Sequence, residues 1–315
     1  MWDFIQQIAP YAIAYTVPIF VTALGGCISE RSGIINIGLE GLMVVGSFIG
    51  GICVYYLGPH IGYGTAAWIG VLLGMAGGVL FSVLHAFACI NLSADQTISG
   101  IAVNMVTGAL VLFCSRGITG TATLVINSMI RVDVPLLNRI PVAGRLLFTD
   151  TYTTTWLITI LLAGVWFLIE KTPFGLRLRA CGEYPEAAAA VGIRVAHIRY
   201  IGVLFSGALA GIGGAVYTVT IAGQSSGSVG GLGFLAIAGV IFGQWRVFRI
   251  LFATLFFGFS VTIAQISMLL PVMTGIHPLI LKIFPYAITL LVLVVFSKSS
   301  HAPAAEGKIF DYKKG

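Results

Sequence analysis

The scarcity of charge along extended apolar stretches constrains this chain more than any other feature of its sequence. Charged residues make up 9% of its 315 positions and hydrophobic residues 58%, and the mean hydropathy is +1.00. Soluble domains carry about 25% charged residues, so a buried core alone does not explain the shortfall. Inside lipid, only helices and closed barrels satisfy their backbone polar groups. The apolar runs approach the roughly 20 residues of a spanning helix, and the sequence predicts an all-α polytopic transmembrane bundle.

We predict about nine membrane segments, with a count of eight to ten left open, in one domain over residues 1–315. The segment at 231–243 is short for a full span and is typical of a broken or re-entrant segment. The count is least certain around 116–150, where an interfacial helix would fit. The predicted segments cover about 4–28, 37–57, 61–88, 97–115, 151–169, 200–222, 231–243, 250–270 and 282–297.

Basic residues in the polar connections predict the orientation of the bundle. The loop 170–199 contains five of them, and the tail 298–315 contains four. Because Lys and Arg concentrate in cytoplasmic loops, we place both segments inside the cell. The loop 116–150 and the amino terminus are then external. The basic residues that set this orientation are Lys171, Arg177, Arg179, Arg194, Arg199, Lys298, Lys308, Lys313 and Lys314.

Glycines recur at the spacing of one helical turn. The chain contains 40 of them, and several pairs are four residues apart. Small residues at this spacing let helix backbones approach closely inside a membrane. The pattern predicts tight helix packing within the bundle or at a dimer interface. The pairs and triplets are Gly46/Gly50, Gly70/Gly74/Gly78, Gly207/Gly211 and Gly239/Gly243.

A first group of polar residues enters the second predicted segment. Asn36, Glu40, Met43 and Ser47 follow the spacing i, i+4, i+7, i+11, which places them on one helix face. Polar groups at membrane depth are costly and are candidates for a translocation pathway. The alternative is a clamp that hydrogen-bonds a neighbouring helix or backbone. Both interpretations stay open for Asn36, whereas the clamp is favoured for Glu40.

A second group lies at the start of the fourth segment and comprises Asp95, Gln96, Ser99 and Asn104. A helix cap explains Asp95 as well as a pathway role does. Gln96 and Asn104 are harder to explain by capping, and we predict pathway roles for this group too. The Gly- and Ser-rich stretch 224–233 suits a loop or unwound segment, either a gate or a surface turn.

The basic loop 170–199 contains a short helix signal. Pro185 is followed by four alanines, and Gly192 provides a stop. So small a helix outside the membrane has little reason to exist alone, and a soluble partner that binds it is the simplest account. A loop that only joins two spans explains the arginines but not the helix.

Covalent chemistry finds no support in the sequence. Protease, esterase and nucleotide-binding P-loop motifs are absent. The five cysteines are scattered and the five histidines isolated, mostly near segment ends. We therefore predict no catalytic residue, no bound metal or cofactor, no nucleic-acid partner, and solvated structural roles for the histidines.

Two motifs together resemble a known family. The segment 182–193, followed by Ser206-Gly207-Ala208-Leu209-Ala210-Gly211, resembles a signature of bacterial ABC importer permeases. That family includes branched-chain amino acid, ribose and nucleoside systems. Tyr184 departs from the family pattern, which commonly has Asn there. The segments 30–41, 94–104 and 302–308 look most similar to the nucleoside (simple sugar) branch, and the resemblance covers nearly the whole chain.

The resemblance implies a transport subunit in the bacterial cytoplasmic (inner) membrane. Its implied partners are a second permease subunit, identical or different, a cytoplasmic ABC ATPase that binds ATP and Mg, and an extracytoplasmic substrate-binding lipoprotein, in a setting of membrane lipid. It also implies that 184–191 is the coupling helix that receives the motion of the ATPase. The implied coupling residues are Glu183, Tyr184, Pro185, Glu186, Ala187, Ala188 and Gly192.

The expected function is a permease subunit of an ATP-driven importer for nucleosides or a related ribosyl or simple-sugar solute. Related permeases serve riboflavin, autoinducer and branched-chain amino acid importers, so those solutes stay open. An ion-coupled secondary carrier is the alternative from another class. It would require Glu40 or Asp95 as its coupling carboxylate.

Overall fold

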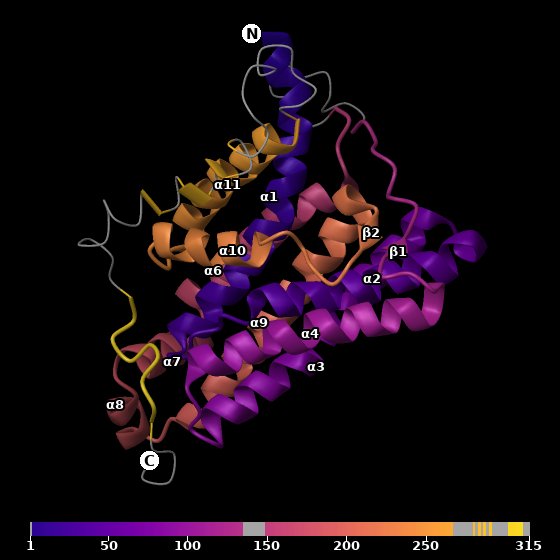
Figure 1. Ribbon diagram of the computed structural model, residues 1–315. Helices are drawn as coiled ribbons and strands as arrows, with labels where there is room; N and C mark the ends of the chain where they lie inside the picture. Colours follow the sequence, from indigo (N-terminus) through magenta and orange to yellow (C-terminus); the bar gives the residue numbers. More distant parts are fainter. Residues whose placement is uncertain are drawn as a thin grey trace.

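The computed structural model describes residues 2–134, 149–266 and 302–310, together with positions 280, 283, 284, 286, 287, 290 and 291. Seven helical segments in these ranges are long and apolar enough to cross a membrane, and a shorter apolar helix accompanies them. The predicted helical membrane bundle is thereby confirmed. Most of the ninth predicted segment, 282–297, lies outside the described residues. The helices are α1 (Trp2–Arg31), α2 (Leu39–Ile61), α3 (Tyr63–Ile90), α4 (Gln96–Thr119), α6 (Trp156–Lys171), α9 (Val195–Tyr217), α10 (Leu232–Phe242) and α11 (Val247–Ile266), as Figure 1 shows.

Short irregular elements join the spans on one side of the bundle. A 3₁₀ turn, η2 (Thr153–Thr155), precedes α6, and a π-helical turn, η3 (Thr218–Ala222), extends α9. Strand β1 (Leu124–Val125) pairs antiparallel with β2 (Gln224–Ser225), a small departure from an all-α chain. Residues 226–231 are irregular, as predicted, whereas the last two residues of the predicted loop, Leu232 and Gly233, already belong to α10. Residues 135–148 of the predicted external loop lie outside the described part of the chain.

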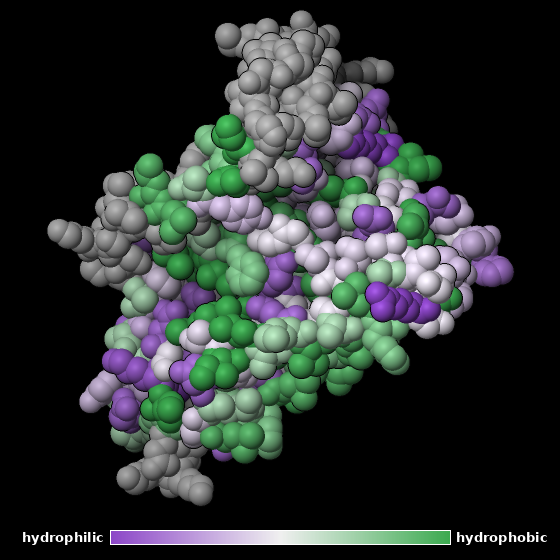
Figure 2. Space-filling view, in the orientation of Figure 1, coloured by the Kyte–Doolittle hydropathy of each residue, from purple (hydrophilic) through white to green (hydrophobic). Residues whose placement is uncertain are grey.

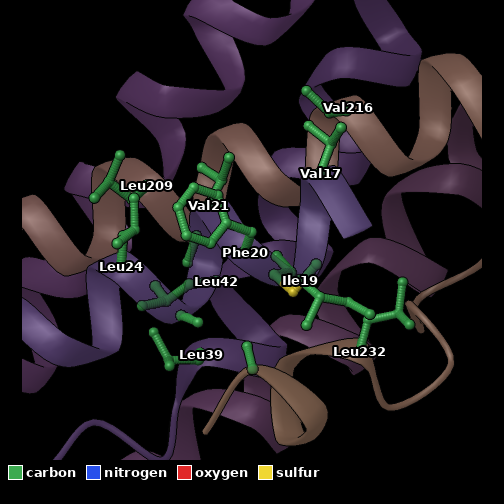
Figure 3. Packing of buried hydrophobic residues seen from close by; sticks show 14 of the residues in the cluster. Val17, Ile19, Phe20, Val21, Leu24, Leu39, Leu42, Leu209, Val216 and Leu232 are labelled. Carbon is green, nitrogen blue, oxygen red and sulfur yellow. The ribbon is translucent and has the colours of Figure 1, made fainter. Parts of the chain in front are cut away.

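The core forms where α1 meets α2, α9 and α10. Figure 3 shows Phe20, Val21 and Leu24 of α1 facing Leu42 of α2 and Leu209 of α9. The close packing of these apolar side chains excludes lipid from the middle of the bundle.

The outer faces of the helices are apolar as well. Figure 2 shows hydrophobic side chains over α3 and α4, where exposed residues include Leu72, Leu80, Leu84, Met105 and Phe113. Such a surface suits contact with lipid tails.

Glycines bring α2, α3 and α9 into backbone contact. A Cβ on Gly46 would lie 2.1 Å from the Gly211 carbonyl oxygen, and one on Gly78 would lie 2.0 Å from that of Gly207. A Cβ on Gly214 would lie 1.8 Å from the Met43 carbonyl oxygen. Separations this short exclude any side chain. The prediction of close packing at the glycine repeats is confirmed within the chain.

Two helices outside the spans occupy the segment between α6 and α9. α8 (Pro185–Ala190) begins with proline at its first turn, and Gly192 follows it at φ +82°, so the predicted short helix is confirmed. α7 (Pro173–Glu183) was not predicted. Its start carries a recognisable signal, because the Thr172 hydroxyl accepts the Gly175 N–H ahead of a first-turn proline. Figure 1 places α7, α8 and the tail 302–310 together at the end of the molecule marked C.

Candidate functional site

The connection between α1 and α2 is buried although it is not helical. Residues 32–38 form a turn, and side chains from α3 and α4 bind its backbone. The Gln96 side-chain oxygen accepts the Ile35 N–H at 2.7 Å, and His85 Nε2 lies 3.0 Å from the Ile35 carbonyl oxygen. Backbone groups inside a membrane protein need such partners, since water is scarce there. These two side chains therefore supply what helix geometry does not.

Asn104 binds the end of the same turn and the start of α2. Its Nδ2 donates to the Ile37 carbonyl oxygen at 3.0 Å, and its Oδ1 accepts the Gly41 N–H at 2.7 Å. From α9, Arg199 Nε donates to the Ser32 carbonyl oxygen at 3.1 Å. We call His85, Gln96, Asn104 and Arg199 the turn clamp. In it, polar groups from three helices fix one buried turn.

Asn36 lies in this turn and not on the face of α2. Because α2 begins at Leu39, the predicted helix face is wrong for Asn36, while Glu40, Met43 and Ser47 lie in α2 and are buried there. The Asn36 Nδ2 donates to the Ser206 hydroxyl at 2.9 Å, and the side chain is buried. Its Oδ1 has no hydrogen-bond partner among the described residues. Asn36 thus retains an unused acceptor inside the bundle.

Glu40 binds the backbone at the start of α10. Its two carboxylate oxygens accept the N–H groups of Gly231 and Gly233 at 2.9 and 2.7 Å. The first N–H groups of a helix lack partners within the helix, and a carboxylate there is favourable. Glu40 thus makes the kind of backbone contact that its interpretation as a clamp predicts.

The remaining members of the two predicted groups lie either at the turn or elsewhere in the bundle. Asp95 is exposed and caps α4, where its carboxylate accepts the Ile98 N–H at 2.9 Å. The Ser99 hydroxyl lies 2.9 Å from His85 Nδ1, on the side of the ring opposite the contact with Ile35, and so orients this member of the turn clamp. Ser47 lies farther along α2 and hydrogen-bonds Thr218 and Ser225. The structure therefore gathers Asn36, Gln96, Ser99 and Asn104 around one turn, and places Asp95 and Glu40 elsewhere.

Two members of the turn clamp were missed at the sequence level. His85 is fully buried between Ser99 and Ile35, so the prediction of a solvated structural role is wrong for it. Arg199 was assigned to the basic loop, but it lies in α9 and its side chain is fully buried. The sequence signal for His85 was a titratable side chain within a long apolar helix.

α8 presents an exposed outer face. Tyr184, Glu186, Ala187 and Val191 are exposed, whereas Pro185 and Ala188 are buried against the protein. Beside it lies a cavity of about 330 Å³ between the end of α8, the start of α9 and Phe310 of the tail. The predicted coupling segment is thus a short helix with one face exposed among the described residues and a cavity beside its end.

The tail connects the end of α7 to the buried turn. The Gly182 carbonyl oxygen accepts the Ala305 N–H at 2.8 Å, and the Gly33 carbonyl oxygen accepts the Gly307 N–H at 3.3 Å. Between these contacts lies Glu306. Burial raises the pKa of its carboxyl to about 7. One short segment therefore contacts both the end of α7 and the α1–α2 turn.

Comparison with known proteins decides the family. A family model described as the permease component of branched-chain amino acid transport systems matches residues 8–293. The chain belongs to this permease family. The permease is 43% identical to the guanosine ABC transporter permease protein NupQ of Bacillus subtilis over 303 residues, 95% of each chain. It is 38% identical to the nucleoside ABC transporter permease protein NupC of Lactococcus lactis over 306 residues, 96% of each.

Family and fold agree for this permease. The resemblance on segments 182–193 and 206–211 is confirmed by a match that covers most of the chain. Seven candidate spans in the described residues fit a multi-pass membrane protein. The motifs that carried the resemblance correspond to α7, α8 and the part of α9 that packs on α2 and α3.

Proposed function

We propose that this permease is the transmembrane subunit of an ATP-driven importer for nucleosides or a closely related ribosyl solute. The observation that supports a nucleoside substrate is the identity of 43% and 38%, over nearly the full length, to relatives named for guanosine and nucleoside transport. Simple sugars, riboflavin, autoinducer and branched-chain amino acids are the alternative solutes. Selectivity in such a system also depends on the separate binding protein.

The remaining parts of the importer are proposed on the same basis. A cytoplasmic ATPase hydrolyses Mg–ATP, and this chain carries no ATPase site. A second permease subunit completes the pathway, and an extracytoplasmic lipoprotein delivers the solute. We place the assembly in the bacterial inner membrane, with the amino terminus outside, the tail inside and nine segments in all, because the basic residues then face the cytoplasm.

α8 is the proposed contact with the ATPase, formed by Glu183, Tyr184, Glu186, Ala187 and Gly192. Motion of the ATPase would move α8 and α7 as a unit. The tail would transmit that motion to the α1–α2 turn, since it bonds to both Gly182 and Gly33. From the turn, the turn clamp reaches α3, α4 and α9. Rigid-body rocking of helices around a central path is the expected response.

Among the proposed pathway residues, Asn36 has the strongest support. It is buried and has an unused acceptor, which suits a neutral, hydroxyl-bearing solute. Gln96, Ser99 and Asn104 surround the same turn, and a change in the turn would alter their positions. Glu40 and Asp95 hold helix starts in the described state, which makes an ion-coupling role for either the weaker alternative.

The test replaces Ala187 by arginine on the exposed face of α8. We expect uptake of labelled guanosine by the complete importer to fall at least tenfold, because a long cation on a close docking face blocks contact. Ala187→Ser is the matched control and should keep uptake within about twofold. Co-purification with the ATPase is measured in parallel and should fall with uptake.

Unchanged uptake by Ala187→Arg would overturn the docking assignment. Uptake abolished by a protonophore while cytosolic ATP stays high would overturn ATP-driven transport in favour of an ion-coupled carrier. Transport of a sugar or an amino acid, but of no nucleoside, would overturn the substrate assignment.

A further inference from the structure

A basic cavity lies beside the ends of three helices and has no place in the proposed transport mechanism. Its volume is about 600 Å³. Five cationic side chains line it against one carboxylate, which leaves an excess of four positive charges. The cations are Arg31, Lys171, Arg179, Arg246 and Arg249, and the carboxylate is Glu170. We call this cavity the basic pocket.

A constrained turn positions the cations contributed by the start of α11. Between α10 and α11, Gln244 and Trp245 both adopt left-handed backbone, at φ 48° and 54°. Non-glycine residues rarely adopt this conformation without support. The support comes from α1, where Arg31 donates to the Trp245 carbonyl oxygen at 2.6 Å and Glu30 accepts the Trp245 indole N–H at 2.6 Å. The turn therefore holds Arg246 and Arg249 in place at the pocket.

The charges in the basic pocket are only partly compensated within the protein. Arg179 pairs with Glu170 at 3.3 Å, and Arg249 donates to the Gln244 side-chain oxygen at 3.1 Å. Lys171 lies over the Trp166 ring, 5.5 Å from its centroid. Within the described part of the chain, the Arg246 side chain has no hydrogen-bond or ion-pair partner. Within the described residues, the cavity therefore carries more positive charge than its one lining carboxylate, Glu170, balances.

The surroundings of the pocket are those of a membrane surface. Trp166 and Phe248 also line it, with ring centroids 6.0 Å apart, and aromatic side chains favour the level of lipid headgroups. Both belong to candidate spans, α6 and α11. Exposed aromatic residues continue along these helices away from the pocket, with Phe167 57% and Phe252 70% exposed. A molecule in the pocket could therefore place an anion among the cations and a hydrocarbon chain along α6 and α11.

We propose that the basic pocket binds the phosphate headgroup of an anionic phospholipid. Basic pockets between spanning helices on the cytoplasmic side suit such headgroups, and the net charge, the aromatic rim and the adjoining apolar surface all agree with that ligand. The phosphate would contact Arg246, Arg249 and Lys171. Free phosphate shares the charge chemistry but has no use for the apolar surface.

The first experiment measures lipid binding to the full-length chain in its complex, by native mass spectrometry from detergent. Phosphatidylglycerol is compared with phosphatidylcholine, which has the same chains and no net charge. We expect preferential retention of phosphatidylglycerol. The double substitution Arg246→Gln with Arg249→Gln should weaken its binding on the order of tenfold or more. The control, Arg116→Gln with Arg177→Gln, removes two exposed arginines outside the pocket and should leave binding unchanged.

The second experiment locates the lipid chain. Phosphatidylglycerol with brominated chains should quench tryptophan fluorescence, and Trp166→Phe should remove a measurable share of that quenching. Three results would overturn the proposal: equal retention of the two lipids, unchanged binding by the double variant, or unchanged quenching in Trp166→Phe. Displacement of phosphatidylglycerol by millimolar inorganic phosphate would assign the pocket to the free anion and overturn the lipid assignment. Loss of phosphatidylglycerol only when the ATPase is bound would show that the pocket serves a protein partner and would also overturn it.

Discussion

The α1–α2 turn and α8 are both short segments, yet they use their residues in opposite ways. In the turn, buried backbone groups are bonded by side chains from α3, α4 and α9. In α8, Glu186 and Ala187 are exposed and bond to no other helix within the described residues. The contrast teaches that polar side chains which hydrogen-bond buried backbone groups maintain the fold. A helix with an exposed face is instead available to contact a partner. Substitutions in the two regions should therefore separate stability from coupling.

The largest expected effect follows from removing Asn104. Asn104→Leu leaves the Gly41 N–H and the Ile37 carbonyl without their partners in a partly buried site. An unsatisfied buried group costs roughly 1–3 kcal/mol, so we expect a loss of about 3 kcal/mol in the free energy of unfolding. Reversible unfolding in mixed micelles measures it. Met105→Leu, on the exposed face of the same helix, is the control and should change little. A loss under about 1 kcal/mol for Asn104→Leu would place this site among ordinary interhelical hydrogen bonds.

A smaller effect is expected from two glycines that share a backbone conformation but not an environment. Gly33 in the turn has φ +97°, and its Cβ would lie 2.7 Å from Arg199 Nη2. Gly192 after α8 has φ +82° and nothing within 4 Å of a Cβ. We expect Gly33→Ala to cost about 2 kcal/mol and Gly192→Ala about 1 kcal/mol, because only the first adds crowding to backbone strain. Equal losses, measured by the same unfolding assay, would remove the distinction between the two regions.

The tail, which bonds to the turn and to the end of α7, should respond modestly to pH. Burial raises the pKa of the Glu306 carboxyl to about 7, so the docked tail favours the protonated form. Its contribution is complete below the ordinary pKa near 4.5 and is lost as pH rises through 7. Two other charged groups lie near the tail: the buried carboxyl of Glu30 faces Glu306, and the Arg199 guanidinium lies over the Phe310 ring. The substitution Glu306→Gln, used in the test below, leaves both in place.

Hydrogen exchange of the Ala305 and Gly307 amides measures this docking. We expect protection a few-fold higher at pH 5.5 than at pH 8.5, after correction for intrinsic exchange rates. Glu306→Gln should be protected alike at both pH values. A wild-type tail with no pH dependence would mean that Glu306 does not control docking.

The smallest effect on stability is expected at the exposed face of α8. Glu186→Lys should change the free energy of unfolding by less than about 0.5 kcal/mol, as is usual for surface substitutions. Substrate-stimulated ATPase activity of the assembled importer should nevertheless fall several-fold. A variant that loses stability and activity together would place α8 in the scaffold, on the same side of the comparison as the turn.

Local signals in the sequence predicted much of the fold. Apolar runs gave the spans, the glycine spacing gave the close packing of α2, α3 and α9, and Pro185 with Gly192 bounded α8. The turn clamp was not predicted, because Asn104 and Ile37 or Arg199 and Ser32 are far apart in the chain and local pattern carries no information about such pairs. Asn36 was assigned to a helix for the same reason, since the buried turn holds its shape through contacts made elsewhere.

The glycine contacts among α2, α3 and α9 also limit how the protein can move. With Gly214 against Met43 and Gly46 against Gly211, neither helix can rotate about its own axis without a backbone collision. We therefore expect α2, α3 and α9 to move as one rigid unit. Bending would then occur at the edge of this unit, where α9 ends. The π-turn Thr218–Ala222 lies at that edge, followed by glycines at 223, 227, 230 and 231 that have positive φ, and we expect any bending to occur there.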